Sequence, residues 1–195
     1  MRYPHILFIL LLFVSVSCKT LMSYTNILKC DFRMESLKNP KVAGIDVTRI
    51  KGFSDLSFIQ AGKITSSYLS GNIPLDFTLN LEVKNPNTTI ARIAQFDWIL
   101  KIDDVQISTG TNGNEYAIAA NDGTVIMPLK ISVNLLDIIN NETKDALLNF
   151  GLNLADASGR PTRVSVQIKP TVYVSSVPIT YPGYLTLGTE FGGDN

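Results

Sequence analysis

Two adjacent aspartates, Asp103 and Asp104, are the residues of this sequence best placed for acid–base chemistry. Two carboxylates that flank one bond can hydrolyse a glycosidic linkage, one as the acid and the other as the base or nucleophile. Neighbouring strand residues point to opposite faces, however, and two polar residues between alternating apolar runs are typical of a hairpin turn. We therefore interpret the pair as a turn, and a polysaccharide hydrolase acting through acidic residues remains the alternative.

Other catalytic and metal-binding chemistry has few residues to draw on. The single histidine, His5, lies in a segment that we expect to be removed, which excludes a Ser-His-Asp or Cys-His arrangement. No Gly-rich phosphate loop is present, and one remaining cysteine cannot form a zinc site. Asn121-Asp122-Gly123 could ligate calcium but lacks the spaced ligands of a calcium loop, so we interpret it as a turn. We assign no catalytic residue, no metal and no cofactor.

The amino-terminal residues carry a targeting signal. Arg2 precedes an apolar run from Ile6 to Val16, which is much shorter than the roughly 20 residues of a membrane-spanning helix. Ser15-Val16-Ser17-Cys18 resembles the lipobox of bacterial lipoproteins, although Ser15 stands where an aliphatic residue is usual. The resemblance implies a signal peptide at 1–17 and lipidation of Cys18. An ordinary secretory signal and a membrane-anchoring helix are the alternatives.

Lipidation at Cys18 would place the protein in the bacterial cell envelope, anchored in the outer membrane or on the periplasmic face of the inner membrane. The membrane is then one partner, since two or more acyl chains anchor a protein stably, and an envelope protein is a further expected partner. Removing 17 of the 195 residues leaves 178, with 16 basic against 17 acidic side chains. This balance favours a single domain and no nucleic-acid partner.

The second cysteine, Cys30, would have no partner in a lipidated chain. A disulfide framework is therefore excluded, and stability must come from the core. Because Cys30 lies between Leu28 and Phe32, a buried thiol is favoured over a reactive one.

The strongest fold signal is the stretch from Leu75 to Asn87. Apolar and polar residues alternate there without exception, which predicts a strand with one buried face, and Asn85-Pro86-Asn87 ends it as a turn. A second alternating stretch, from Ala94 to Asp103, places Trp98 in the core rather than on a ligand platform. Further strands are predicted at Val42–Lys51, Val105 onward, Glu115–Ala119, Val125–Leu135, Val164–Val172 and within Ile179–Leu187.

Two segments predict helices. Ser54 to Ser70 is interpreted as a short helical connection with Gly71 as its C-terminal cap. Asn141 to Leu154 has helical spacing, with Asn141 as its N-cap. Its charged residues are interpreted as a solvated face: Glu142, Lys144 and Asp145.

Together these elements predict an all-β fold with one or two inserted helices, an antiparallel two-sheet sandwich of the immunoglobulin or fibronectin type III kind. Pro128 and Pro170 indicate edges or bulges. The domain is expected at 42–189, after a lipidated N-terminus and tether at 18–41 and before a tail at 190–195. The predicted core is Phe77, Leu79, Leu81, Phe96, Trp98, Leu100, Leu129, Ile131, Val166 and Ile168.

The order of elements from Val42 to Leu187 resembles the water-stress and hypersensitive-response (WHy) domain of the type 2 late embryogenesis abundant proteins. The strand closed by Asn85-Pro86-Asn87, the internal Trp98 and the long strand followed by a helix carry the resemblance. It implies a sandwich without a known catalytic site, a link to stress tolerance, and bacterial relatives that are often envelope lipoproteins. We expect a non-catalytic envelope lipoprotein with a binding or structural role, and an envelope polysaccharide hydrolase is the alternative.

Overall fold

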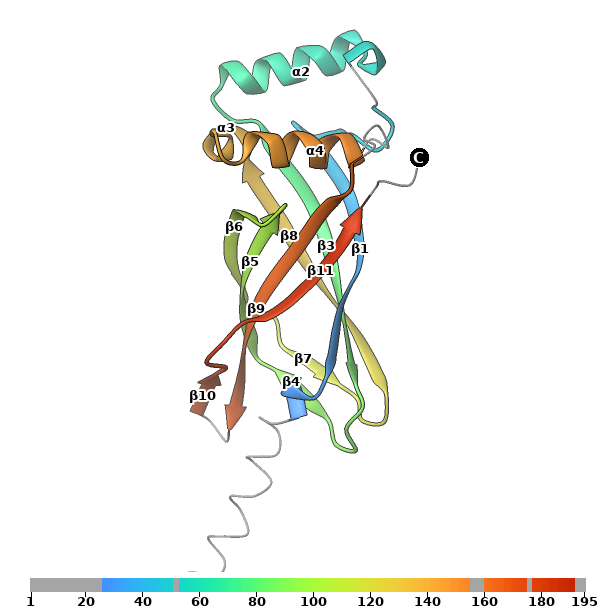
Figure 1. Ribbon diagram of the computed structural model, residues 1–195, viewed down its shortest axis with the longest axis vertical. Helices are drawn as coiled ribbons and strands as arrows, with labels where there is room; N and C mark the ends of the chain where they lie inside the picture. Colours follow the sequence, from blue (N-terminus) through green and yellow to red (C-terminus); the bar gives the residue numbers. More distant parts are fainter. Residues whose placement is uncertain (1–25, 51–52, 155–159, 175–176, 192–195) are drawn as a thin grey trace, which may run out of the picture.

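The computed structural model describes residues 26–50, 53–154, 160–174 and 177–191, which form two main antiparallel sheets. The strands run along the long axis of the molecule, and the helices gather at one end (Figure 1). The first sheet has the order β2-β1-β3-β8, with β1 (Asp31–Val42), β2 (Ile45–Asp46), β3 (Pro74–Asn85) and β8 (Gly123–Asn134). This architecture confirms the predicted all-β fold with inserted helices.

The second sheet is built on β9 (Thr162–Val174). One side of β9 pairs with β5 (Gln95–Ile102), and β5 pairs in turn with β6 (Val105–Asn112). The other side pairs first with β11 (Leu185–Phe191) and then with β10 (Val177–Thr180). A two-stranded sheet of β4 (Ala91–Ile93) and β7 (Tyr116–Ile118) lies at the end opposite the helices (Figure 1).

The core fills the space between the two sheets. Side chains of β3 are buried at every second position, as the alternation predicts, because successive side chains point to opposite faces of the sheet and one face lies against the core. On α4 (Lys144–Leu154) the ring of Phe150 packs against Phe77, with ring centroids 5.7 Å apart, so this helix covers one end of the core. All of the predicted core residues are buried: Phe77, Leu79, Leu81, Phe96, Trp98, Leu100, Leu129, Ile131, Val166 and Ile168.

Trp98 requires a glycine on the neighbouring strand. It pairs with Gly110 of β6, and a Cβ atom at Gly110 would lie only 2.5 Å from Cζ2 of the indole. The ring therefore occupies the volume that a side chain at Gly110 would need. Its burial confirms the core role predicted for Trp98.

The first strand begins earlier than predicted. Residues 31–41, expected as part of the tether, form most of β1 and pair with β3, whereas Val42–Lys51 is not a continuous strand. Register shifts between Met34 and Ser36 and between Lys38 and Lys41 interrupt the period of two, which concealed the strand in the sequence. Pro40 is buried at the second shift.

Of the two prolines expected at edges or bulges, Pro128 lies on β8, the outer strand of the first sheet, as predicted. Pro170 does not lie at an edge: β9 has neighbours on both sides, and its pairing with β5 runs through Pro170 without a shift. The carbonyl of Pro170 accepts a hydrogen bond from the Tyr181 N–H. An N–H at Pro170 would point to that same side, where the neighbour changes from β11 to β10, so no ladder bond is lost.

The connection before β3 contains η1 (Phe53–Asp55) and α2 (Phe58–Leu69), which confirms the helix predicted there. Ser57 and Gln60 form a reciprocal capping box at its start. At its end Gly71 has a φ of 72°, as expected of a glycine that follows a helix.

The second helical region differs in its start. A short helix, α3 (Leu135–Ile138), precedes α4, and α4 begins at Lys144 rather than at Asn141. The cap is the side chain of Asn140, whose Oδ1 accepts from the N–H groups of Glu142 and Thr143. Among the described ranges, no helix is both long and apolar enough to cross a membrane.

Candidate functional site

The adjacent aspartates occupy the tip of the β5–β6 hairpin. Asp103 and Asp104 have φ values of 47° and 66°, the left-handed geometry that a two-residue hairpin turn requires. The predicted turn is therefore confirmed. Aspartate suits these positions because its short polar side chain tolerates positive φ better than most residues do.

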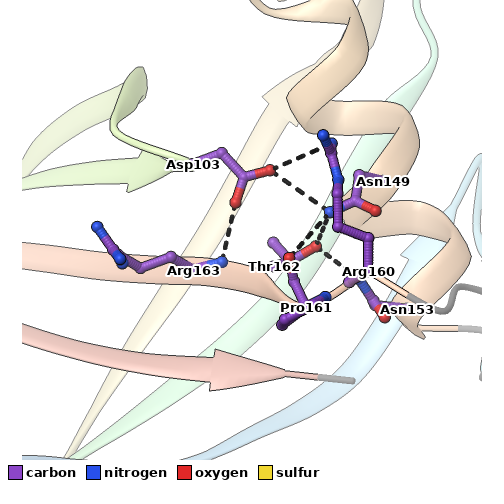
Figure 2. A network of polar contacts seen from close by, with 7 residues as sticks. All are labelled: Asp103, Asn149, Asn153, Arg160, Pro161, Thr162 and Arg163. Carbon is purple, nitrogen blue, oxygen red and sulfur yellow. Dashed lines mark hydrogen bonds and ion pairs between the residues drawn. The ribbon is translucent and has the colours of Figure 1, made fainter. Parts of the chain in front are cut away.

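The carboxylate of Asp103 is directed toward α4 and the start of β9 (Figure 2). Its Oδ1 accepts a hydrogen bond from the backbone N–H of Arg163 at 2.9 Å. Its Oδ2 lies 3.4 Å from Nδ2 of Asn149 and 3.8 Å from the guanidinium of Arg160. One carboxylate thus joins the hairpin to a strand and a helix that are far away in the sequence.

Asp104 contacts the side chain of Arg163, the residue whose backbone N–H donates to Asp103. Its Oδ2 lies 3.2 Å from Nη1 of Arg163, and the other terminal nitrogen of that guanidinium lies 3.6 Å from Glu190. Asp103 therefore accepts from the backbone of Arg163, and Asp104 pairs with the side chain of the same residue.

Two asparagines of α4 complete the network (Figure 2). The buried hydroxyl oxygen of Thr162 accepts from Nδ2 of both Asn149 and Asn153, each at 2.7 Å. Asn153 Nδ2 also donates to the carbonyl of Arg160 at 2.8 Å. These contacts fasten α4 to the start of β9, and sequence reasoning missed them. The spacing of four residues between the asparagines, which puts them on one helix face, is the signal that could have found them.

A depression of about 300 Å³ lies beside this network. Both basic residues on its wall, Arg160 and Arg163, pair with carboxylates. Such a surface holds elements together and can contact polar groups. Its lining residues are Asp103, Asp104, Arg160, Pro161, Arg163 and Glu190.

A second polar cluster surrounds Asn85, the last residue of β3. Its buried Nδ2 lies 2.9 Å from the carbonyl of Thr89 and 3.1 Å from those of Ile118 and Ala119. Its Oδ1 accepts from the backbone N–H and the side chain of Asn87. The sequence predicted a turn here, and the structure adds that one side chain joins β3, the following loop and β7.

Cys30 lies against this cluster. Its thiol donates to the carbonyl of Asn26 at 3.3 Å and lies 3.7 Å from Oδ1 of Asn85. Burial and, to a smaller extent, the neighbouring charge of Asp31 raise the pKa of Cys30 to about 11. The predicted buried thiol is confirmed.

The remaining candidates lie on the surface or outside the described ranges. Asn121 and Asp122 have positive φ, and Asp122 pairs with Lys84 at 3.0 Å, so this turn prediction is confirmed. Within the part of the chain that the structure describes, no three His, Cys, Asp or Glu side chains gather as metal ligands would. The residues predicted as the solvated helix face, Glu142, Lys144 and Asp145, are exposed. Cys18 and His5 lie outside the described residues.

Comparisons with known proteins find no matching family model and no matching curated protein. A crystal structure of an Archaeoglobus fulgidus protein is 12% identical, with a TM-score of 0.37, covering 82% of this chain and 96% of that one. A solution structure from Arabidopsis thaliana is 12% identical, with a TM-score of 0.42, covering 82% and 76%. A solution structure described as a candidate late embryogenesis abundant (LEA) protein is 13% identical, with a TM-score of 0.38, covering 94% and 86%. Similarity this remote carries no argument, and the fold described above stands on the strand pairing of this chain.

Proposed function

We propose that this protein is a non-catalytic cell-envelope lipoprotein, a β-sandwich that binds or supports other envelope components from an acyl anchor at Cys18. The observation that supports a non-catalytic role is the use of its polar side chains. Asp103 joins a hairpin to a helix and a strand, and Asn85 joins three segments of the chain. Hydrogen bonds within the fold account for the placement of these polar groups.

A link to stress tolerance belongs to the same proposal and is supported by the WHy resemblance of the sequence. It is tested by deleting the gene and measuring survival after drying and osmotic shock. Complementation by the native gene, and not by a Cys18→Ser version, would tie the phenotype to the anchored form. Equal survival of the deletion strain and its parent would argue against a stress role.

For a protein partner, the edge of β6 is the better candidate for strand addition. β6 and β8 are each the outer strand on one side of a main sheet, with β2 on the far side of the first sheet and β10 and β11 on the far side of the second, and such edges present unpaired backbone groups. Pro128 interrupts the edge of β8, whereas β6 contains no proline. Its last residue, Asn112, reaches across to the Pro128 carbonyl, at 3.4 Å.

The test is crosslinking and pull-down of the full-length protein from solubilised membranes. It compares the native protein with two variants that each carry one proline in β6, Ser108→Pro and Thr109→Pro. One of Ser108 and Thr109 directs its N–H toward β5 and the other directs it outward. Proline at the outward position leaves the pairing with β5 intact and should abolish capture of a stoichiometric envelope protein. Capture that survives in the stably folded variant would exclude the β6 edge as the binding site.

The hydrolase alternative rests on the carboxylates around the charged depression, Asp103, Asp104 and Glu190. It requires turnover of a purified cell-wall glycan by the native protein. It also requires that Asp103→Asn and Asp104→Asn each abolish turnover while the variants remain folded. Absence of turnover by the native protein supports the non-catalytic proposal.

A further inference from the structure

Exposed apolar side chains gather at both ends of the molecule. At one end α2 has no buried residue and presents Phe58, Ile59, Tyr68 and Leu69, but the structure shows nothing that covers them. The opposite end, which we call the anchor end, consists of the turn at residues 26–30, the β3–β4 loop, the end of β9 and the start of β10 (Figure 1).

Hydrogen bonds hold the parts of the anchor end together. The side chain of Asn87, in the β3–β4 loop, donates to the carbonyl of Asn26 at 3.0 Å. The N–H of Ala94, after β4, donates to the carbonyl of Thr171 on β9 at 2.8 Å. Ile27 beside Asn26 is buried in the core. Asn26, where the chain that follows Cys18 enters the domain, is therefore fixed to this end by hydrogen bonds and packing.

The anchor end exposes four large apolar side chains: Leu28 (37% exposed), Ile90 (49%), Tyr173 (52%) and Val177 (62%). They come from three separate segments, so their exposure is not a property of one irregular loop. Aliphatic side chains with a tyrosine are the composition that settles at the boundary between headgroups and acyl chains.

The charges of this end are balanced. Lys29 and Arg92 stand against Asp31 and Glu115. Arg92, Glu115 and Tyr173 line one depression of about 250 Å³ between the small sheet and β9. A cation and an anion at one depression suit a zwitterionic headgroup, whose phosphate and ammonium carry the complementary charges.

We propose that the anchor end lies on the phospholipid surface, with Leu28, Ile90, Tyr173 and Val177 at headgroup depth. This inference rests on the proposed acylation of Cys18. Eight residue steps separate Cys18 from Asn26, a reach of at most about 27 Å when fully extended. A tether this short brings the anchor end, and not the α2 end, to the bilayer that holds the acyl chains.

The test places a fluorophore on single introduced cysteines in the full-length protein, reconstituted in phosphatidylcholine–phosphatidylethanolamine vesicles with a nitroxide-labelled lipid. Val177→Cys and Ile90→Cys report the anchor end, and Ile59→Cys on α2 is the control at an exposed apolar position of the opposite end. The buried Cys30 is the unlabelled background. We expect strong quenching at 177 and 90 and none at 59, without any anionic lipid.

The mass of the same protein separates this proposal from the anchor itself. If the protein is acylated but shows no quenching at 177 and 90, the proposed membrane contact of the anchor end is wrong and the proposed acylation of Cys18 is supported. Quenching at 177 and 90 that persists in Cys18→Ser versions of these variants, which carry neither an acyl chain nor a thiol at position 18, supports the membrane contact and rejects the anchor as its cause. Quenching at 59 alone assigns the lipid contact to α2 and overturns the proposal, as does quenching at 177 and 90 that appears only after anionic lipid is added.

Discussion

At the scale of single residues, Asn85 joins three segments of the chain through one side chain. Its side chain is buried; the amide nitrogen lies within hydrogen-bond distance of three carbonyls, of which that of Ile118 is in a buried contact, and its oxygen accepts from Asn87. Buried carbonyls that lose their donor keep the cost of their desolvation, so the contribution of this side chain exceeds that of an exposed hydrogen bond.

Asn85→Ala should lower the free energy of unfolding by about 1–3 kcal/mol, the cost of leaving buried polar groups unpaired. Asn85→Asp should cost more, because it removes the same donors and places a charge in a buried site. Urea unfolding measures both, with the exposed Asn114→Ala as the matched control. Equal stabilities of all three variants would contradict the role assigned to Asn85.

Cys30 makes stability depend on pH in the alkaline range. Its pKa is raised from 9.0 to about 11 in the folded state, so the folded protein holds the thiol proton more tightly than the unfolded chain does. The contribution is therefore complete below pH 9 and is lost as the pH rises from 9 to 11. Native protein should lose more stability over this window than a Cys30→Ala variant, as followed by thermal unfolding. Parallel pH profiles for the two proteins would refute this.

At the scale of secondary-structure elements, the contact between β5 and β6 depends on a residue with a large side chain that pairs with a residue that has no side chain. Trp98 covers the backbone of Gly110, and the two strands cannot keep this register with a side chain in both places. The indole is one of the largest groups of the core, so the register of the hairpin and the packing of the core are linked.

Gly110→Ala should destabilise the protein by roughly 1–3 kcal/mol, the range for overpacking in a filled core. Gly113→Ala is the control, because a Cβ at Gly113 meets no atom within 4 Å. Adding Trp98→Phe to Gly110→Ala should recover part of the loss, since a smaller ring vacates the volume. Chemical unfolding of the native protein, the two glycine variants and the double variant measures these stabilities. Equal stabilities of Gly110→Ala and Gly113→Ala would count against the proposed contact.

At the scale of the whole molecule, the anchor end and the end that carries the helices lie at opposite ends of the long axis (Figure 1). A protein held through Cys18 would therefore present α2, α3 and α4 away from its own membrane. That polarity follows from where Asn26 enters the sandwich, which the hydrogen bonds to the β3–β4 loop determine.

Cys18→Ser should stall processing or release the protein from the membrane fraction, because the acyl chains would supply its stable attachment. Cys30→Ser is the matched control and should remain membrane-bound at the mature mass. Cell fractionation with mass measurement of the intact protein distinguishes the two variants. A membrane fraction that is unchanged by Cys18→Ser would overturn the lipoprotein proposal.

Elements with a local signal were predictable from the order of residue types. Leu75 to Val83 alternate strictly, so the buried face of β3 was predictable residue by residue, and Asp103-Asp104 was predictable as a turn because it separates two alternating runs. Gly71 likewise marked the end of α2. In each case the determining interaction spans only a few residues, so its pattern is preserved in the order of residue types.

Features that depend on contacts between distant segments were not predictable in this way. The bulges of β1 break its period, so its place beside β3 depends on pairing with a strand some 45 residues away. Asn85 and Asn149 look like ordinary polar residues of a turn and a helix, and their roles exist only where β7, β9 and the β5–β6 hairpin arrive beside them. A hydrogen bond between distant segments leaves no periodic trace in either one, since each partner needs only to be polar.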